Sequence, residues 1–276
     1  MNAKLQDKVA LVSGSGRGIG RAIALKLASE GARVVVNDLD AAPAEETVEL
    51  IRAQGGQAVS CVGSVTHTDF AERFIDTAVQ HYQGLDIIVN NAGYTWDNVV
   101  QKMTDEQWYA ILDCHLTAPF RILRAAQPVI KQLAHAETQA GQRVMRKVVN
   151  ISSVAGLFGN AGQSNYSVAK AGITGMTMTL AKEWGRMNVN VNCVAFGLIK
   201  TRLTSSAADG DTAHIEGRDI KIGVNPGLMA AMEQMIPLGR GGTPEEAAGA
   251  VYLFCQPESD YISGQTLMCT GGLTGI

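Results

Sequence analysis

The chain has 276 residues, of which 46% are hydrophobic and 18% are charged, and its formal net charge is −3. These proportions are typical of a protein with a well-buried core and exclude a disordered chain. Lys and Arg form no long basic block. We therefore expect no nucleic-acid partner, because phosphate binding needs concentrated positive charge.

Short Val- and Ile-rich runs alternate along the chain with segments that carry apolar residues at helical spacing. The predicted strands are Val9–Val12, Val34–Val36, Ala58–Val62, Asp86–Val89, Lys147–Ile151, Val189–Val194 and Thr266–Met268. The predicted helices are Ile19–Leu27, Ala42–Ala53, Phe70–Tyr82, Asp105 to about Leu133, Ser164–Trp184 and one that opens at Thr243-Pro244. This alternation predicts an α/β fold with helices on both faces of a doubly wound parallel sheet. We expect one single-domain Rossmann fold over residues 1–276.

Two stretches interrupt the alternation. Residues 136–146 are polar and predict a loop, and residues 201–236 predict a long insertion before the last helix. Residues 1–16 lack the apolar stretch of a signal peptide, and no segment offers about eighteen uninterrupted apolar residues for a bilayer. The five cysteines are scattered, without a CxxC pair. We therefore expect a cytoplasmic protein with reduced thiols, no membrane association and no metal site.

A glycine-rich turn follows the first predicted strand and opens the first predicted helix. Its glycines are Gly14, Gly18 and Gly20, spaced G-x-x-x-G-x-G rather than G-x-G-x-x-G. Glycines allow a backbone to approach a pyrophosphate, which then lies at the positive end of the helix. A plain strand–helix connection is the alternative. The position between a strand and a helix favours a dinucleotide-binding turn.

Asp38 follows the second predicted strand. A carboxylate there can accept both hydroxyl groups of an adenine ribose and would repel a 2′-phosphate, which favours NAD over NADP. An ordinary turn-forming Asp is the alternative. Arg17 favours the opposite cofactor, because a guanidinium near the glycine turn can pair with a 2′-phosphate. We give Asp38 more weight because it would lie beside the ribose itself.

Two later motifs extend the candidate site. Asn90-Asn91-Ala92-Gly93 follows the fourth predicted strand and can contact a flat ring or a ribose, although it is also common turn sequence. Tyr166 and Lys170 lie four residues apart and share one face of a predicted helix. A fixed ammonium near the phenol would lower its pKa from about 10 and help it to pass a proton. Most such pairs are only surface pairs.

The motifs SGSGRGIG, NNAG, Ser153, Tyr166-x-x-x-Lys170 and FGLIKT together resemble the short-chain dehydrogenase/reductase family over nearly the whole chain. The resemblance is closest to its 3-oxoacyl-(acyl-carrier-protein) reductase branch. It implies that Ser153 hydrogen-bonds a substrate carbonyl and that Tyr166 is the general acid in reduction and the base in oxidation. Lys170 would hold the nicotinamide ribose and tune Tyr166.

The same resemblance implies a set of cofactor contacts. Ser64 and Val65 take the place that contacts adenine, and Ile199 and Thr201 take the place that contacts the carboxamide. With the residues already named, the expected NAD-binding set is Gly14, Arg17, Gly18, Ile19, Gly20, Asp38, Leu39, Ser64, Val65, Asn91, Gly93, Tyr166, Lys170, Ile199 and Thr201.

Three positions depart from the family pattern. Ser64 stands where the family usually has Asp, and Phe196 stands where it has Pro before Gly. His115 replaces an Asn that anchors a proton-relay water. A core histidine is an equal alternative, because His115 continues a stripe of buried-type spacing that begins at Trp108. We keep His115 as a weak catalytic candidate.

The expected function is hydride transfer between NAD(H) and a ketone or secondary alcohol, with a 3-oxoacyl or 3-hydroxyacyl thioester as the favoured substrate. The resemblance also implies a homotetramer built through two long helices and the last strand. The insertion at 201–236 is the expected substrate lid, with apolar residues Leu203, Ile220, Ile222, Leu228, Met229, Met232 and Met235.

Two alternatives remain open. One is a dehydrogenase of a small alcohol, sugar or steroid. The other is a non-catalytic dinucleotide-binding sensor or subunit, against which Ser153, Tyr166 and Lys170 argue, because a sensor needs none of them.

Overall fold

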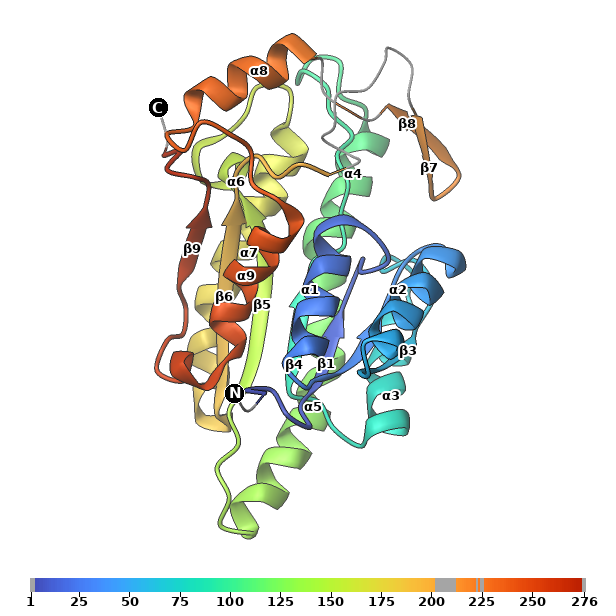
Figure 1. The fold of residues 1–276 in the computed structure, drawn as a ribbon. Helices are drawn as coiled ribbons and strands as arrows, with labels where there is room; N and C mark the ends of the chain where they lie inside the picture. The colour runs from blue at the N-terminus through green and yellow to red at the C-terminus, as the bar shows by residue number, and fades with distance from the viewer. Residues whose placement is uncertain (1–2, 202–211, 222, 224–225, 275–276) are drawn as a thin grey trace.

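The computed structural model describes residues 3–201, 212–221, 223 and 226–274. Its centre is a parallel sheet of seven strands in the order β3-β2-β1-β4-β5-β6-β9. These strands are β1 (Val9–Val12), β2 (Arg33–Val36), β3 (Gln57–Ser60), β4 (Ile87–Asn90), β5 (Arg146–Ser153), β6 (Val189–Phe196) and β9 (Thr266–Cys269). The α/β Rossmann-type fold predicted from the sequence is confirmed (Figure 1).

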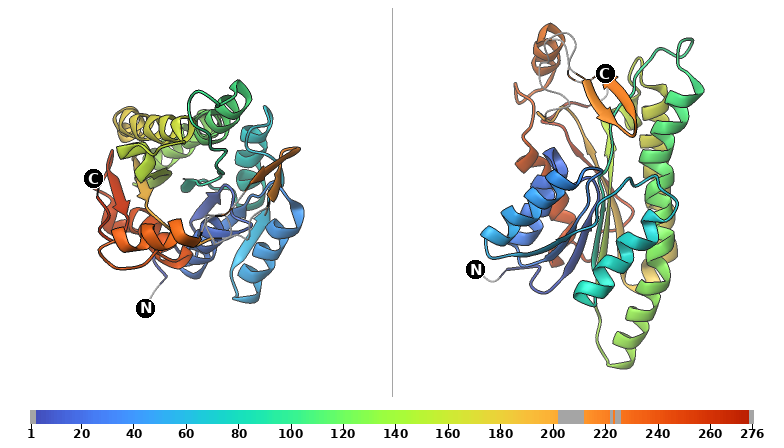
Figure 2. Two further views of the ribbon diagram at one scale, coloured as in Figure 1. Left: turned by 90° about the horizontal axis from the view of Figure 1, so that it is seen from above. Right: turned by 90° about the vertical axis from the view of Figure 1, so that its right-hand side faces the viewer.

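Helices cover both faces of this sheet (Figure 2). One face carries α1 (Gly18–Ser29), α2 (Ala41–Ala53) and α9 (Pro244–Cys255), and the other carries α3 (Phe70–Tyr82), α4 (Asp105–Leu112), α5 (Ala118–Gln139) and α7 (Ser164–Trp184). Strands covered on both sides need continuous apolar runs. Every residue of β1 and of β6 is accordingly buried.

The strand order reverses at β1, because the chain first runs outward through β2 and β3 and then returns to add β4 on the other side. The loops that leave the carboxyl ends of β1 and β4 therefore diverge and leave a crevice between them. Ligands of open α/β sheets bind in that crevice. Two short helices, α6 (Val154–Phe158) and α8 (Pro226–Met235), lie at this carboxyl end of the sheet (Figure 1).

The structure corrects two sequence predictions on the second face. The helix predicted from Asp105 to about Leu133 is interrupted by a wider π turn at Asp113–Thr117 and then runs to Gln139. The loop predicted at 136–146 is consequently shorter. Arg146, the first residue of β5, is buried and forms a two-pronged ion pair with Glu137 on the last turn of α5. That pairing holds the polar end of the helix against the sheet.

The predicted insertion at 201–236 contains a hairpin of β7 (Thr212–Ile215) and β8 (Arg218–Lys221), followed by α8. Its two-residue turn is Glu216-Gly217, with φ of 50° and 79°. Positive φ at both positions identifies a type I′ turn, which matches the twist of antiparallel strands. Of the apolar residues predicted for this segment, Leu203 and Ile222 lie outside the described residues, as does the side chain of Leu228.

Across the part of the chain that the structure describes, no helix is long and apolar enough to cross a membrane. Within the same residues, no cluster of His, Cys, Asp and Glu is arranged to hold a metal ion.

Candidate active site

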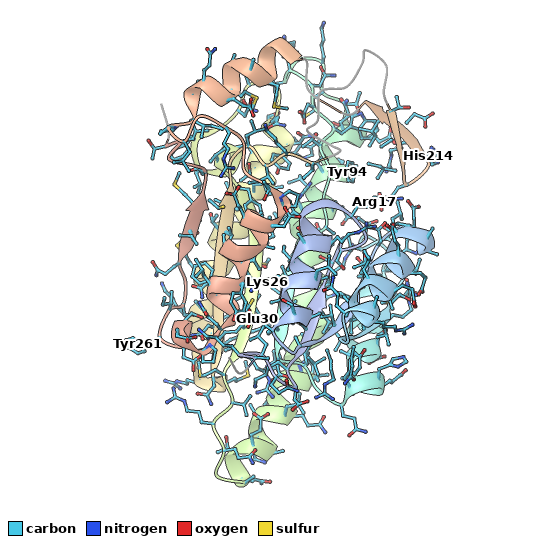
Figure 3. All side chains as sticks on the ribbon, viewed as in Figure 1. Arg17, Lys26, Glu30, Tyr94, His214 and Tyr261 are labelled. Atoms are coloured by element: carbon cyan, nitrogen blue, oxygen red, sulfur yellow. The ribbon has the colours of Figure 1, made fainter. Side chains whose placement is uncertain are left out.

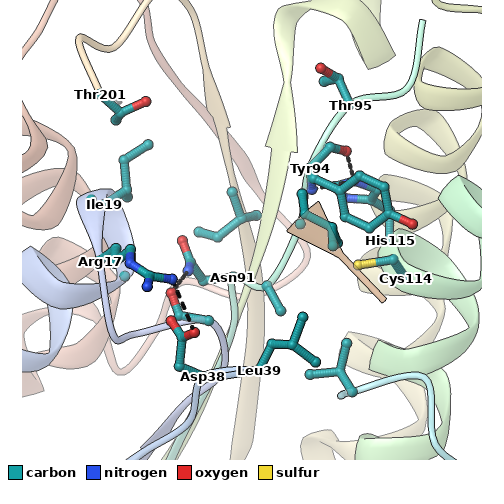
Figure 4. A pocket seen from close by; sticks show the side chains of 18 of the residues that line it. Arg17, Ile19, Asp38, Leu39, Asn91, Tyr94, Thr95, Cys114, His115 and Thr201 are labelled. Atoms are coloured by element: carbon teal, nitrogen blue, oxygen red, sulfur yellow. Dashed lines mark hydrogen bonds and ion pairs between the residues drawn. The ribbon is translucent and has the colours of Figure 1, made fainter. Parts of the chain in front are cut away.

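A cavity of about 620 Å³ opens at the carboxyl end of the sheet, a size typical of ligand and cofactor sites (Figure 4). Its walls come from the segments that follow β1 to β6 and from the β7–β8 hairpin. Every site residue predicted from the sequence lines this one cavity. Residues 115, 153, 166 and 170 belong to the π turn, β5 and α7, and residues 17, 38, 39, 64 and 65 belong to the segments after β1, β2 and β3.

The side chains of two asparagines hydrogen-bond the backbone of the glycine-rich turn. Gly14 N–H donates to Asn37 Oδ1 at 3.0 Å, and Asn91 Nδ2 donates to the carbonyl oxygens of Ser13 and Gly14 at 2.9 and 3.0 Å. A Cβ on Gly20 would overlap the carbonyl of Gly14, so the first turn of α1 packs directly against the loop. This leaves the positive end of α1 facing the cavity, which fits a pyrophosphate group.

Asp38 is buried beside this turn, at the place predicted for an adenine ribose. Its Oδ2 accepts from Gly16 N–H at 3.1 Å, and its Oδ1 accepts from Asp40 N–H at 3.1 Å. A carboxylate offers about four acceptor positions, so each oxygen keeps one for a hydroxyl group. The residue is thus fixed in position and still able to bind a ribose diol.

Arg17 forms ion pairs with two carboxylates across the mouth of the cavity. Its Nη1 lies 3.0 Å from Asp40 Oδ2 and 3.6 Å from Asp38 Oδ1. Arg17 is labelled in Figure 3, and Figure 4 shows it beside Asp38. A phosphate that approached Arg17 would also approach both acids. Because two carboxylates already offset its charge, the guanidinium supports binding of a 2′-phosphate less than the sequence alone indicated.

Ser153, Tyr166 and Lys170 meet on the inner wall of the cavity. Ser153 ends β5, and its hydroxyl lies close enough to the phenol of Tyr166 on α7 to lower the pKa of that phenol. Lys170 Nζ donates to the carbonyl of Ile151 at 2.7 Å and lies 5.5 Å from the centre of the Tyr166 ring. The i,i+4 spacing thus places phenol and ammonium on the same side of the helix.

The acidity of this set differs from the expectation. Burial raises the pKa of Tyr166 to about 12, against a smaller lowering by the Ser153 hydroxyl. The prediction that Lys170 would lower this pKa below 10 is wrong for the chain alone, because burial dominates. Burial also lowers the pKa of Lys170 to about 8. The phenol of Tyr166 is therefore protonated at neutral pH, while the ammonium group of Lys170 loses its proton only slightly above neutral pH.

His115 projects from the π turn into the same site. Its Nε2 lies 2.6 Å from the carbonyl oxygen of Tyr94, and its ring meets the edge of the Tyr166 ring with centroids 5.0 Å apart. Burial, followed by the charge of Lys170, holds the pKa of His115 well below its usual range. The imidazole is therefore neutral at physiological pH. The 2.6 Å contact with a carbonyl oxygen, which can only accept, assigns the proton to Nε2 and leaves Nδ1 as an acceptor. Nδ1 is buried and has no hydrogen-bond partner among the residues that the structure describes.

The position of His115 is compatible with both interpretations, and its catalytic role stays a prediction. The side chain is buried, as the stripe spacing predicted, and it also lines the cavity. The absence of a Cβ at Gly93 makes room for it, since a Cβ there would overlap the imidazole ring. The lowered pKa disfavours a role through protonation near neutral pH, whereas a role as a fixed acceptor is compatible with the geometry.

Three residues of the site were not predicted as functional. Asn37 holds the glycine-rich turn, Tyr94 orients His115, and Glu216 reaches the cavity from the hairpin turn. Asn37 stands directly before Asp38 at the end of a strand, which was a usable signal. Glu216 lies 152 residues from its partner Ser64, so no local pattern could have found it.

Comparison with known proteins places the chain in a defined group. A family profile described as Enoyl-(Acyl carrier protein) reductase matches residues 14–274. The chain is 39% identical over 273 residues to 3-oxoacyl-(acyl-carrier-protein) reductase of Synechocystis, with 98% of each chain covered. It is 35% identical over 271 residues to the enzyme of the same name from Thermotoga maritima, covering 98% of this chain and 99% of the relative. The corresponding protein of Vibrio cholerae is 35% identical over 270 residues, with 98% of each covered.

Proposed function

The chain belongs to the short-chain dehydrogenase/reductase family of oxidoreductases, and from that premise we propose that it interconverts 3-oxoacyl and 3-hydroxyacyl thioesters with NAD(H). One observation carries the proposal. The glycine-rich turn and the Ser153, Tyr166 and Lys170 set share a single cavity. The relatives of the chain described above are named 3-oxoacyl-(acyl-carrier-protein) reductases, and this supports a 3-oxoacyl thioester as the substrate class. We also propose that the whole chain is one domain of this family.

The proton chemistry follows from the two hydroxyl groups. Ser153 and Tyr166 lie near each other in the cavity wall, and each hydroxyl has one proton that it can donate to a substrate carbonyl oxygen. In reduction, Tyr166 gives its proton to that oxygen while Ser153 holds the oxygen in place. A pKa of about 12 keeps the phenol protonated for this step. In oxidation the same groups act in reverse, with Tyr166 as the base.

Lys170 has the position and the acidity to support Tyr166. One of its three N–H bonds is directed to the carbonyl of Ile151, which leaves two for the hydroxyl groups of a ribose. Its pKa of about 8 lets it return a proton toward Tyr166 near neutral pH. When bound beside these residues, the nicotinamide supplies or accepts the hydride.

NAD(H) rather than NADP(H) is proposed because of the charge beside the expected ribose. Asp38 is buried and hydrogen-bonded in place, and Asp40 adds a second carboxylate against Arg17. A phosphate charge about 4 Å from a carboxylate is repelled by roughly 4 kcal/mol at an effective dielectric constant of 20. Steady-state kinetics with both reduced nucleotides tests this proposal, and a kcat/KM for NADPH equal to or above that for NADH would contradict it.

The substrate class is tested with a panel of carbonyl compounds and the absorbance of the reduced nicotinamide. The panel contains 3-oxoacyl thioesters of coenzyme A and of acyl carrier protein, small ketones, oxidised sugars and steroid ketones. We expect the thioesters to give the highest kcat/KM. Faster turnover of a sugar or steroid would favour the other dehydrogenase classes, and no turnover of any compound would favour the sensor.

We also propose a homotetramer in the cytoplasm. Large apolar side chains stay exposed on the helices predicted to form its interface, namely Tyr109 on α4, Phe120 on α5, and Val168 and Met178 on α7. Single exposed apolar residues are common, but a set along packed long helices fits burial against a second subunit. Light scattering tests this, and a stable monomer of 29.2 kDa at micromolar concentration would contradict it.

A further inference from the structure

The β7–β8 hairpin was expected to cover the substrate, yet its turn meets the loop that follows β3. The carboxylate of Glu216 forms a short hydrogen bond with the Ser64 hydroxyl and accepts from Thr66 Oγ1 at 2.8 Å. Thr66 N–H donates in turn to Ser64 Oγ at 3.1 Å. The hairpin therefore closes on the wall where an adenine base is expected, and residues 212–216 line the cavity there.

We propose that Glu216 is a specificity-determining residue that binds the exocyclic 6-amino group of the cofactor's adenine. This rests on the proposal that the cavity holds a nicotinamide dinucleotide. A carboxylate is an acceptor only, and an amino group on an aromatic ring is a donor. Glu216 thus favours binding of a purine that carries an amino group at position 6.

The acceptor capacity of Glu216 supports this role. Its Oε1 accepts from both Ser64 and Thr66, which uses the two positions of that oxygen. Its Oε2 accepts a long hydrogen bond of 3.4 Å from Arg218 Nη1 and has a second lone pair that can accept another hydrogen bond. The Glu216 side chain is 19% exposed and lines the cavity, so its carboxylate is largely shielded from bulk water.

The backbone of the hairpin indicates that a carboxylate is kept here at a conformational cost. Glu216 adopts a left-handed φ of 50°, which Asn, Asp or Gly adopts more readily than Glu. Strained positions of this kind tend to occur at functional sites. The longer Glu side chain is the one that reaches Ser64.

Arg218 fixes the hairpin over the site from the other side. Its guanidinium pairs with Glu106 at the start of α4 at 2.8 Å and stacks on the ring of Trp96, 5.6 Å from its centre. These contacts hold the turn against the cavity independently of Glu216. A substitution of the Glu216 carboxylate therefore leaves other anchors for the hairpin in place.

The test compares two nucleotides whose purines differ in the group at position 6 and in the proton that accompanies it on ring nitrogen N1. NADH carries the 6-amino group, and nicotinamide hypoxanthine dinucleotide in its reduced form carries a 6-oxo group, which only accepts. Dissociation constants for both are measured by fluorescence titration for the wild type, E216Q and D219N. Asp219 lies on the same hairpin, pairs with His214 and does not line the cavity, so D219N controls for the loss of one negative charge.

We expect the wild type and D219N to bind NADH about tenfold more tightly than the hypoxanthine analogue, since a charged hydrogen bond is replaced by repulsion between two acceptors. E216Q should bring the ratio near one, because its amide can donate to the 6-oxo group. An unchanged ratio in E216Q, or an equal loss of both nucleotides, would show that Glu216 only closes the hairpin. A wild-type ratio of one would overturn the proposal whether or not E216Q folds. Failure of the wild type to bind any nicotinamide nucleotide would instead refute the proposed function.

Discussion

Replacing Tyr166 by Phe is the most direct test of the proposed chemistry. The substitution removes one hydroxyl group and retains the ring, whose edge contact with His115 has centroids 5.0 Å apart. Ser153 keeps its hydrogen bond from Ala155 N–H at 3.2 Å. We therefore expect the fold and nucleotide binding to survive and the proton transfer to be lost.

The expected loss follows from the role of the hydroxyl group. General acid–base catalysis by one side chain contributes roughly 10²- to 10⁴-fold, which corresponds to about 3–5 kcal/mol of activation free energy. In Tyr166→Phe we expect kcat for reduction to fall within this range while the dissociation constant for NADH changes less than about threefold.

The pKa of Tyr166 also predicts the pH dependence in each direction. The acid needed for reduction is the phenol, which is present at all pH values below about 12, so Tyr166 imposes no fall in the reduction rate up to pH 10. The base needed for oxidation is the phenolate, whose fraction rises about tenfold per pH unit below the pKa. Oxidation should therefore accelerate about tenfold per pH unit up to about pH 8 and more slowly above it, because Lys170, with its pKa of about 8, then loses its charge.

The assay is the change in nicotinamide absorbance in both directions, from pH 6 to pH 10, with NADH binding measured in parallel. Tyr261→Phe is the matched control, because that tyrosine is fully exposed and does not line the cavity. Its kcat should equal that of the wild type. Turnover by Tyr166→Phe within tenfold of the wild type would refute the assignment, and so would a wild-type oxidation rate that does not rise with pH.

Three further variants test the rest of the site. Asp38→Ala should reduce the preference for NADH over NADPH by tenfold or more, measured as the ratio of kcat/KM values, and an unchanged ratio would mean that this carboxylate does not select the cofactor. His115→Leu should lower kcat about tenfold without changing the shape of the pH profile, because the imidazole is already neutral, whereas unchanged kcat would leave it a packing residue only. Glu137→Ala should destabilise the fold by about 3 kcal/mol in denaturant unfolding, because Arg146 is buried and would lose both prongs of its ion pair; a loss below about 1 kcal/mol would show that water replaces the carboxylate.

The sequence alone determined the features that depend on local spacing. The apolar runs of β1 and β6 are visible because strands buried on both faces need no polar alternation. Tyr166 and Lys170 could be paired because one helical turn brings residues four apart onto one face. The glycine-rich turn and Asp38 were recognisable because each directly follows a strand, and the carboxyl ends of parallel strands share one edge.

Only the tertiary structure decided what depends on burial and on distant contacts. The pKa of Tyr166 rises rather than falls, since desolvation acts through everything that surrounds the phenol. His115 reaches the cavity through a π turn that a helical repeat does not reveal. Glu216 meets Ser64 across 152 residues because a hairpin folds back over the sheet edge. Such a contact depends on how packed elements meet in space, which the residues on either side of Glu216 do not encode.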